Sequence, residues 1–437
     1  MKKHTIGLWF FIAALAANLV VGYRLHSEEA KKTGQDEVFK QIDVMMEVLQ
    51  LIRKNYVDAD NVTYRMLFEG AMKGMTNVLD PFSEYLEPRD FNTLQEETEG
   101  EFGGIGIEVD YADDCIIVIA PMDGTPAERA GIQPGDKIYK VDGENIGEIG
   151  QEAAIRKMRG QPGTKVKISY MRDGFDDLKE IELTRAKIPI ISVTDARIIP
   201  DTTIGFVRIT QFMEKTPDEL EAKLREMFAD DKTTGLIIDL RNNPGGLVTA
   251  AVKICSMFLK PDTFVVSLEG RSDKHVEKTL RGYQFPNKPL ILLVNEGSAS
   301  AAEIMSGCLS THKRAKLYGT KTYGKGSVQN VIDLNNGGAL KLTIAHYYVQ
   351  PDTVKDRKTI HKHGIVPDNV IKLAPKEAAD LKKFDEEWLA AREKEDLTEA
   401  ERIKIDNDYR QKRKRFDVVL NAAVKALMED AAQNKIE

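Results

Sequence analysis

Ser300 and Lys325 lie in two short motifs whose residue types could perform hydrolytic chemistry. Ser300 belongs to residues 295–303 (NEGSASAAE), directly after an apolar run, and Lys325 belongs to residues 323–329 (YGKGSVQ). A strand that enters a helix through a glycine-containing turn exposes a serine hydroxyl beside the free N–H groups of the helix start. A lysine between two glycines can be approached by backbone on both sides, so its amine can be buried and desolvated. The pair predicts a serine nucleophile activated by an unprotonated lysine.

A third motif supports this interpretation. Residues 239–246 (DLRNNPGG) follow another apolar run and end in two glycines. The three motifs, in this order and spacing, resemble those of the carboxyl-terminal processing (tail-specific) proteases. The resemblance implies that Ser300 is the nucleophile, Lys325 the general base and Gln329 the residue that orients the lysine. It also implies an oxyanion hole formed by the N–H groups of Gly246 and Ala301, and the sequence leaves Gly245 open in place of Gly246.

The same resemblance extends over most of the chain and divides it into five regions. We expect a signal peptide or membrane anchor in residues 1–35 and a helical region in 36–97, followed by a PDZ domain in 98–186. A serine protease core in 187–375 and a charged helical region in 376–437 complete the chain. The predicted fold class is mixed α/β. The family implies a crotonase-like or ClpP-like core with an inserted β-rich PDZ domain.

The predicted PDZ domain contains a glycine-rich loop, FGGIGI, at residues 102–107. The backbone N–H groups of Gly104, Ile105, Gly106 and Ile107 are expected to hold the terminal carboxylate of a peptide whose last side chain is apolar. Residues 151–158 are expected to form the helix beside the peptide groove. Arg159 follows that helix at the position of a family arginine implicated in coupling the PDZ domain to the active site. It could equally be a solvated cation at the helix end.

Beyond residue 187, apolar runs of strand length alternate with helical patterns, which indicates an α/β core. We expect strands at 204–210, 235–240 and 290–294 and helices at 219–228, 248–258 and 301–309. Strands at 327–334 and 340–349 are predicted to form a hairpin through the turn residues 335–338 (NNGG). The serine motif therefore starts where a predicted buried strand ends.

Composition excludes several function classes. The 437 residues carry a net charge of −7 with both signs mixed, and no basic stripe with interleaved aromatics indicates a nucleic-acid partner. The three cysteines, Cys115, Cys255 and Cys308, lie in apolar runs without metal-ligand spacing, which favours buried thiols. We therefore expect neither a metal nor another cofactor.

The first residues carry a targeting pattern. Lys2 and Lys3 precede an uncharged stretch from Thr5 to Tyr23, and residues 14–16 (ALA) match a small-x-small cleavage site. Apolar residues continue past that site, which favours an uncleaved anchor in the inner or plasma membrane. In either case the body of the protein is expected in the periplasm or cell envelope.

Other residues that could do chemistry have simpler interpretations. His346 and His363 adjoin no carboxylate in an arrangement that indicates a serine-histidine-aspartate triad, so structural roles are favoured. Glu303 is expected to cap or pack, and Asp239 and Arg241 to stabilise the turn leading to the oxyanion hole.

The C-terminal helical region has an apolar stripe (Phe416, Val419, Leu420, Ala423 and Leu427) and a capping box at Thr398 and Glu401. It is predicted either to pack on the N-terminal helices or to form a dimer arm, so a homo-oligomer through the terminal helices is possible.

Two functions remain open from the sequence. The first is a serine endopeptidase that recognises protein or peptide substrates with apolar C-termini and is gated by its PDZ domain. The second is a non-catalytic PDZ scaffold on a crotonase-like core. The complete set of Ser300, Lys325 and Gln329 favours the enzyme.

Overall fold

The computed structural model describes residues 37–437 except 113, 231, 356, 358, 373, 393–400, 402–403, 406–407, 410–411, 413 and 434–437. The chain forms two compact units, residues 1–85 and 86–437. The predicted targeting segment and Thr398 lie outside the described residues. None of the helices in the described ranges is both long enough and apolar enough to cross a membrane.

The first unit is helical in its described part, as expected. A helix covers residues 37–55, and a short 3-10 turn, η1 (Ala59–Asn61), precedes α2 (Tyr64–Asn77). The Thr63 side chain accepts a hydrogen bond from Met66 N and so caps α2. β1 (Glu84–Leu86) crosses the boundary to the second unit.

The centre of the second unit is a six-stranded sheet. Its strand order is β10 (Val193–Ile198), β11 (Ile204–Ile209), β12 (Gly235–Asp239), β15 (Leu290–Val294), β16 (Lys316–Gly319) and β19 (Asn369–Val370). β10 is antiparallel to β11, and the remaining neighbours are parallel. Every residue of β12 and β15 is buried, as expected for parallel strands with both faces covered.

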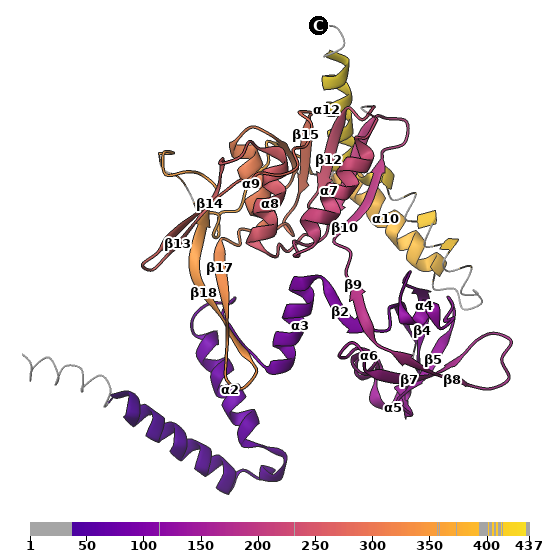
Figure 1. Cartoon of the computed structure of the whole chain (residues 1–437), viewed down its shortest axis with the longest axis vertical. Helices are drawn as coiled ribbons and strands as arrows, with labels where there is room; N and C mark the ends of the chain where they lie inside the picture. Colours follow the sequence, from indigo (N-terminus) through magenta and orange to yellow (C-terminus); the bar gives the residue numbers. More distant parts are fainter. Residues whose placement is uncertain are drawn as a thin grey trace, which may run out of the picture. The chain divides into compact units, whose positions relative to one another are not determined.

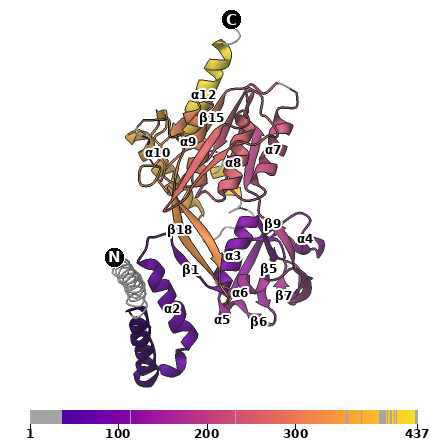
Figure 2. The same cartoon turned by 60° about the vertical axis from the view of Figure 1, so that its left-hand side comes forward.

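Helices cover both faces of this sheet (Figures 1 and 2). α7 (Thr216–Met227), α8 (Val248–Phe258) and α9 (Ala301–Thr311) pack on one face, where Leu236, Ile238 and Leu292 join the main core. Because strand side chains alternate, Ile237 and Leu293 point to the other face. There they contact α12 (Val418–Gln433).

The C-terminal helix α12 packs on the core sheet, a position that neither expectation for this region named. Ala423 and Leu427 of the predicted apolar stripe are buried against the core sheet, and Val419 and Leu420 are partly buried there. The stripe packs on the face of the sheet opposite α7, α8 and α9, because that face would otherwise expose apolar side chains to water. α10 (Pro375–Arg392) and the 3-10 turn η2 (Lys414–Phe416) precede α12.

A second sheet flanks the core helices. It pairs β13 (Phe264–Gly270) with β14 (Lys274–Lys278) and with β18 (Ala339–Tyr348), which in turn pairs with β17 (Ser327–Asp333). The β17–β18 hairpin closes at the predicted turn, where Leu334 N donates to Gly338 O. This long hairpin extends away from α8 and α9 (Figure 2).

A separate β domain lies between α3 (Pro88–Glu99) and β10. β2 (Glu101–Gly104) and β9 (Ala186–Pro189) pair where the chain enters and leaves it. Its sheet runs β3 (Ile107–Ala112), β4 (Cys115–Pro121), β5 (Lys137–Val141), β7 (Lys165–Met171) and β8 (Lys179–Thr184), with β6 (Glu144–Asn145) beside β5. α4 (Pro126–Arg129), α5 (Ile146–Ile149) and α6 (Gln151–Met158) accompany the sheet around a core of its own. The domain is attached by the paired strands rather than merged into the main core.

Candidate active site

Ser300 lies at the turn from β15 into α9. It is the N-cap of α9, and its backbone has φ 55° and ψ −117°. Residues other than glycine rarely adopt this backbone conformation. The Ser298 hydroxyl fixes the backbone of this turn, because it donates to Leu240 O and accepts from Asn295 N. The Ser300 side chain remains partly exposed. The sequence-predicted strand, turn and helix thus present this hydroxyl at an accessible corner.

Glu303 connects the Ser300 turn to the Lys325 loop. Its Oε2 accepts hydrogen bonds from Ser300 N and Lys325 N, both at 2.9 Å. Its Oε1 accepts from the Thr322 hydroxyl at 2.6 Å and from Gly324 N at 2.8 Å. Burial raises the pKa of Glu303, while these hydrogen bonds oppose that rise. The expected capping role is thus only part of what this carboxylate does.

The amine of Lys325 is in an environment that disfavours its charge. Burial is the main reason that the pKa of Lys325 lies below its ordinary value of 10.5, and the nearby charge of Lys341 lowers it further. The negative charge of Glu303 acts in the opposite direction. A lysine with a lowered pKa is a better proton acceptor near neutral pH.

Two backbone N–H groups near Ser300 have the properties of oxyanion-hole donors. Within the described residues, no acceptor pairs with the N–H of Gly246 or of Ala301, the first residue of α9. The N–H of Gly245, in contrast, donates to the Asn243 side chain at 2.8 Å. This favours Gly246 over Gly245, the alternative that the sequence left open.

Gly246 also occupies a position that tolerates no side chain. Its φ is 137°, and a Cβ there would lie 2.1 Å from the carbonyl oxygen of Phe212. Phe212 N donates to Gly245 O, and Leu247 N donates to Phe212 O, so an isolated parallel bridge joins Gly246 to Phe212. The close approach explains why glycine is required.

Gln329 lies on β17, four residues after Lys325. Its Nε2 donates to the hydroxyls of Ser327 and Thr343, at 3.0 and 3.1 Å. These bonds fix the amide on the hairpin that begins just after the lysine. Its role in orienting Lys325 stays a prediction.

Tyr347 is a site residue that the sequence interpretation missed. Its hydroxyl donates to Lys325 O and lies beside the side chain of Ser300. Burial raises the pKa of Tyr347, so the phenol stays protonated. Nothing in the sequence pattern of β18 indicated this contact.

Arg241 connects the oxyanion motif to the C-terminal helix. Its guanidinium donates to both carboxylate oxygens of Asp239 and to both of Asp417, over distances of 2.7 to 2.9 Å. Burial alone would lower the pKa of Arg241, but the two carboxylates raise it overall. The expected stabilisation of the turn by Asp239 and Arg241 therefore includes a third, unforeseen partner.

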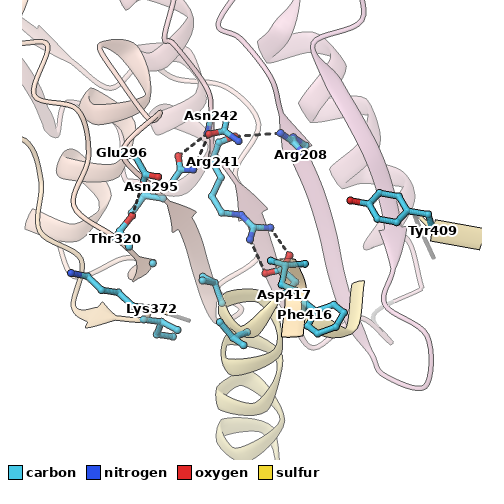
Figure 3. A pocket seen from close by; sticks show the side chains of 16 residues that line it. Arg208, Arg241, Asn242, Asn295, Glu296, Thr320, Lys372, Tyr409, Phe416 and Asp417 are labelled. Atoms are coloured by element: carbon cyan, nitrogen blue, oxygen red, sulfur yellow. Dashed lines mark hydrogen bonds and ion pairs between the residues drawn. The ribbon is translucent and has the colours of Figure 1, made fainter. Parts of the chain in front are cut away.

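A cavity of about 750 Å³ lies beside this ion-pair group (Figure 3). It opens at the ends of β11, β12, β15 and β16, and its wall includes Arg241, Asn242, Asn295 and Asp417. Asn242 and Asn295 join two of these strand ends, since Asn295 Nδ2 donates to Asn242 Oδ1 and Asn242 N donates to Asn295 Oδ1. Neither Ser300 nor Lys325 lines this cavity.

The remaining candidates take structural positions. Cys115, Cys255 and Cys308 are buried free thiols, and the Cys308 thiol donates to Phe264 O at 3.8 Å. His346 contacts Gly326 O and the ring of His361, and His363 contacts His361 O. Among the described residues, no group of three His, Cys, Asp or Glu side chains could hold a metal ion.

The glycine-rich loop of the β domain has a geometry suited to a carboxylate. Within the described residues, no acceptor pairs with the N–H groups of Ile105 and Gly106. Gly106 has φ 78°, and a Cβ there would overlap the Thr125 side chain. Arg159 ends α6 with its guanidinium carbon 4.6 Å from the ring centre of Phe102. The arginine is therefore stacked on the first residue of the loop.

Comparisons with known proteins identify the family and the domains of this chain. Residues 203–371 match the model of peptidase family S41, residues 117–172 match a PDZ domain, and residues 7–89 match the N-terminal domain of the activating protease CtpB. A carboxy-terminal-processing protease of Bartonella bacilliformis is 36% identical over 83% of this chain and 82% of its own length. The chain belongs to peptidase family S41.

Other relatives of this S41 peptidase carry similar names. The carboxy-terminal processing protease CtpA of Bacillus subtilis is 35% identical, over 69% of this chain and 63% of its own length. Among solved structures, a photosystem II D1 C-terminal processing protease is 29% identical over 74% of this chain and 86% of its own, with a TM-score of 0.43. Family membership confirms the predicted mixed α/β fold with a PDZ domain and the prediction of a carboxy-terminal processing peptide hydrolase, and it disfavours the scaffold interpretation.

Proposed function

We propose that this S41 peptidase hydrolyses peptide bonds through a serine–lysine mechanism with a covalent acyl-enzyme. The observation that carries the proposal is the shared carboxylate oxygen of Glu303, which holds the backbones of Ser300 and Lys325 together. The lowered pKa of Lys325 supports its role as the base.

The reaction follows from these positions. Ser300 Oγ attacks the carbonyl carbon of the scissile bond while its proton passes to Lys325 Nζ. The N–H groups of Gly246 and Ala301 stabilise the negative oxygen of the tetrahedral intermediate. The Lys325 ammonium then protonates the leaving amine. A water molecule, deprotonated by Lys325, attacks the acyl carbon, and Lys325 returns that proton to Ser300 Oγ as the carboxylic acid product leaves. Gln329 orients the Lys325 amine. Because its amide is uncharged, it does not raise the pKa of Lys325.

The substrates are proposed to be extracytoplasmic proteins with apolar C-termini. The free N–H groups of Ile105 and Gly106 would hold the terminal carboxylate, with the remaining tail added as a strand beside the groove. Affinity on the order of micromolar is expected, because few residues are buried. Export rests on the charged and apolar pattern of residues 2–23, which also supports an anchor in the inner or plasma membrane.

Arg159 is proposed to couple tail binding to activity through its contact with Phe102. A bound tail can activate the enzyme only if it binds the active arrangement more tightly than the resting one. The stacking of Arg159 on the carboxylate loop supports a role beyond that of a solvated helix-end cation.

The test compares cleavage of an unstructured protein by the wild type, Ser300→Ala and Lys325→Ala. Both variants should lose turnover while keeping the wild-type thermal unfolding profile. A substrate trapped on Ser300 should appear as a mass increase of the enzyme after rapid acid quenching. Full activity of Lys325→Ala, or loss of wild-type activity on addition of a chelator, would refute the mechanism.

A further inference from the structure

We propose that Asp417, at the start of the C-terminal helix α12, is a positioning residue for the oxyanion loop. The proposal rests on the serine–lysine mechanism above. It goes beyond that mechanism because it assigns a role in the chemistry to a residue 176 positions away from Arg241 in the sequence.

Asp417 performs two tasks with one carboxylate. Oδ1 accepts from Leu420 N at 3.0 Å, which caps the first turn of α12. The same oxygen accepts from Arg241 Nη1 at 2.7 Å, and Oδ2 accepts from Arg241 Nη2 at 2.8 Å. Figure 3 shows this bidentate pair at the start of the helix, with Arg241 reaching toward it from β12. The position of α12 on the sheet therefore determines where the guanidinium lies.

Arg241 transmits this position to the loop that contains Gly246. Its backbone N–H donates to Asp239 Oδ1, so side chain and backbone are fixed by the same carboxylate. The next residue, Asn242, has φ 58° and bonds to Asn295, which begins the turn leading to Ser300. The far end of the loop is held by Gly246 against Phe212. A movement of Arg241 would therefore displace both the N–H group of Gly246 and the turn that contains Ser300.

Packing explains why Asp417 is needed in addition to Asp239. The Arg241 side chain is only 20% exposed, and Asp417 is the acceptor of its Nη1. The cavity of Figure 3 lies beside the guanidinium and has room for another orientation. Without the Asp417 carboxylate, Nη1 would lose an acceptor in a partly buried place, and the guanidinium would turn toward water in the cavity.

The test replaces Asp417 with Asn in the full-length protein. We expect kcat to fall about 10- to 100-fold with KM changed less than about threefold, because an oxyanion-hole donor is displaced rather than removed. Asp417→Glu should recover part of the loss. Asp430→Asn is the matched control on the same helix, since Asp430 pairs with the exposed Lys316 at 3.6 Å, and it should retain wild-type kcat.

Two further measurements separate positioning from stability. A peptide aldehyde forms a hemiacetal whose oxygen occupies the oxyanion hole, so its affinity should fall in Asp417→Asn in parallel with kcat, while the matching peptide amide binds as before. Leu427→Ala weakens the packing of α12 but keeps the ion pair. It should keep kcat at temperatures where it remains folded.

The proposal is overturned if Asp417→Asn matches Asp430→Asn in kcat and aldehyde affinity. It is also overturned if Leu427→Ala loses kcat equally, since docking of the helix alone would then explain the effect. Failure of the underlying mechanism is recognised separately, because only then does Ser300→Ala remain active.

Discussion

Ser300 and Lys325 donate their backbone N–H groups to the same atom, Oε2 of Glu303, each over 2.9 Å. The two proposed reacting residues come from different strand ends, after β15 and after β16. One buried carboxylate oxygen fixes the spacing of their backbones. The precision of the site thus depends on a group that need not touch the substrate.

Glu303→Gln should reduce both activity and stability. The amide keeps one carbonyl oxygen, so its NH₂ group must face either Ser300 N and Lys325 N or the donors from Thr322 and Gly324. We expect kcat to fall about 100-fold or more because the site is displaced. The free energy of unfolding should fall by about 2 to 4 kcal/mol because buried donors lose their acceptor.

The control for this substitution is Glu296→Gln. Glu296 lies on the same turn but is exposed, and its carboxylate accepts from the Thr320 hydroxyl. Steady-state kinetics and chemical denaturation of the two variants should differ clearly. Equal kinetics would show that Glu303 does not position the site.

The pH dependence of kcat/KM should report the protonation of Lys325. Only the neutral amine accepts the proton of Ser300, so kcat/KM should rise with pH through a pKa below 10.5. Lys341→Met removes a charge that lowers this pKa, so the rising limb should move to higher pH and activity at neutral pH should fall. Lys321→Met, which alters an exposed lysine nearer in sequence, should leave the profile in place. A rising limb at the same pH in all three proteins would contradict the assignment.

Gly246→Ala should abolish turnover. The new Cβ would lie 2.1 Å from Phe212 O, and φ 137° is unfavourable for alanine, so the loop and its N–H must move. A fall in kcat of at least about 100-fold is expected from loss of one oxyanion donor. Gly282→Ala serves as the control, since no atom lies within 4 Å of the Cβ position there. Retained activity in Gly246→Ala, measured with a fluorogenic peptide, would exclude this residue from the oxyanion hole.

Arg159→Ala should uncouple the PDZ domain from the active site. A short, uncleaved peptide with an apolar C-terminus is expected to stimulate hydrolysis of a second substrate by the wild type but not by Arg159→Ala. Peptide affinity, measured by fluorescence anisotropy, should stay within about threefold, because the carboxylate contacts are retained. Arg159→Lys keeps the charge but loses the planar stacking on Phe102. It should therefore show little stimulation by the peptide.

Arg156→Ala is the matched control, since Arg156 is an exposed residue of the same helix paired with Glu152. It should respond to the peptide as the wild type does. Simple competition by the peptide in every protein would leave the PDZ domain as a tether without a gating role.

The sequence by itself determined the local elements and the positions of the candidate reactive side chains within them. α8 and β15 have the bounds that their apolar patterns predicted, because short buried segments with strong periodicity leave few alternatives. The serine and lysine motifs were equally local, since each requires small neighbours at fixed positions. The order of the motifs was sufficient to identify the family.

Only the tertiary structure decided which distant groups meet. The Asp417 carboxylate, the Tyr347 hydroxyl and the double acceptance by Glu303 depend on contacts between strand ends and helices far apart in the sequence. The apolar stripe of α12 shows the same limit, because its periodicity predicted a buried face without saying what covers it. Periodicity determines which side of an element is buried, whereas packing of the whole sheet determines against what, and that packing brings Arg241 and Asp417 together.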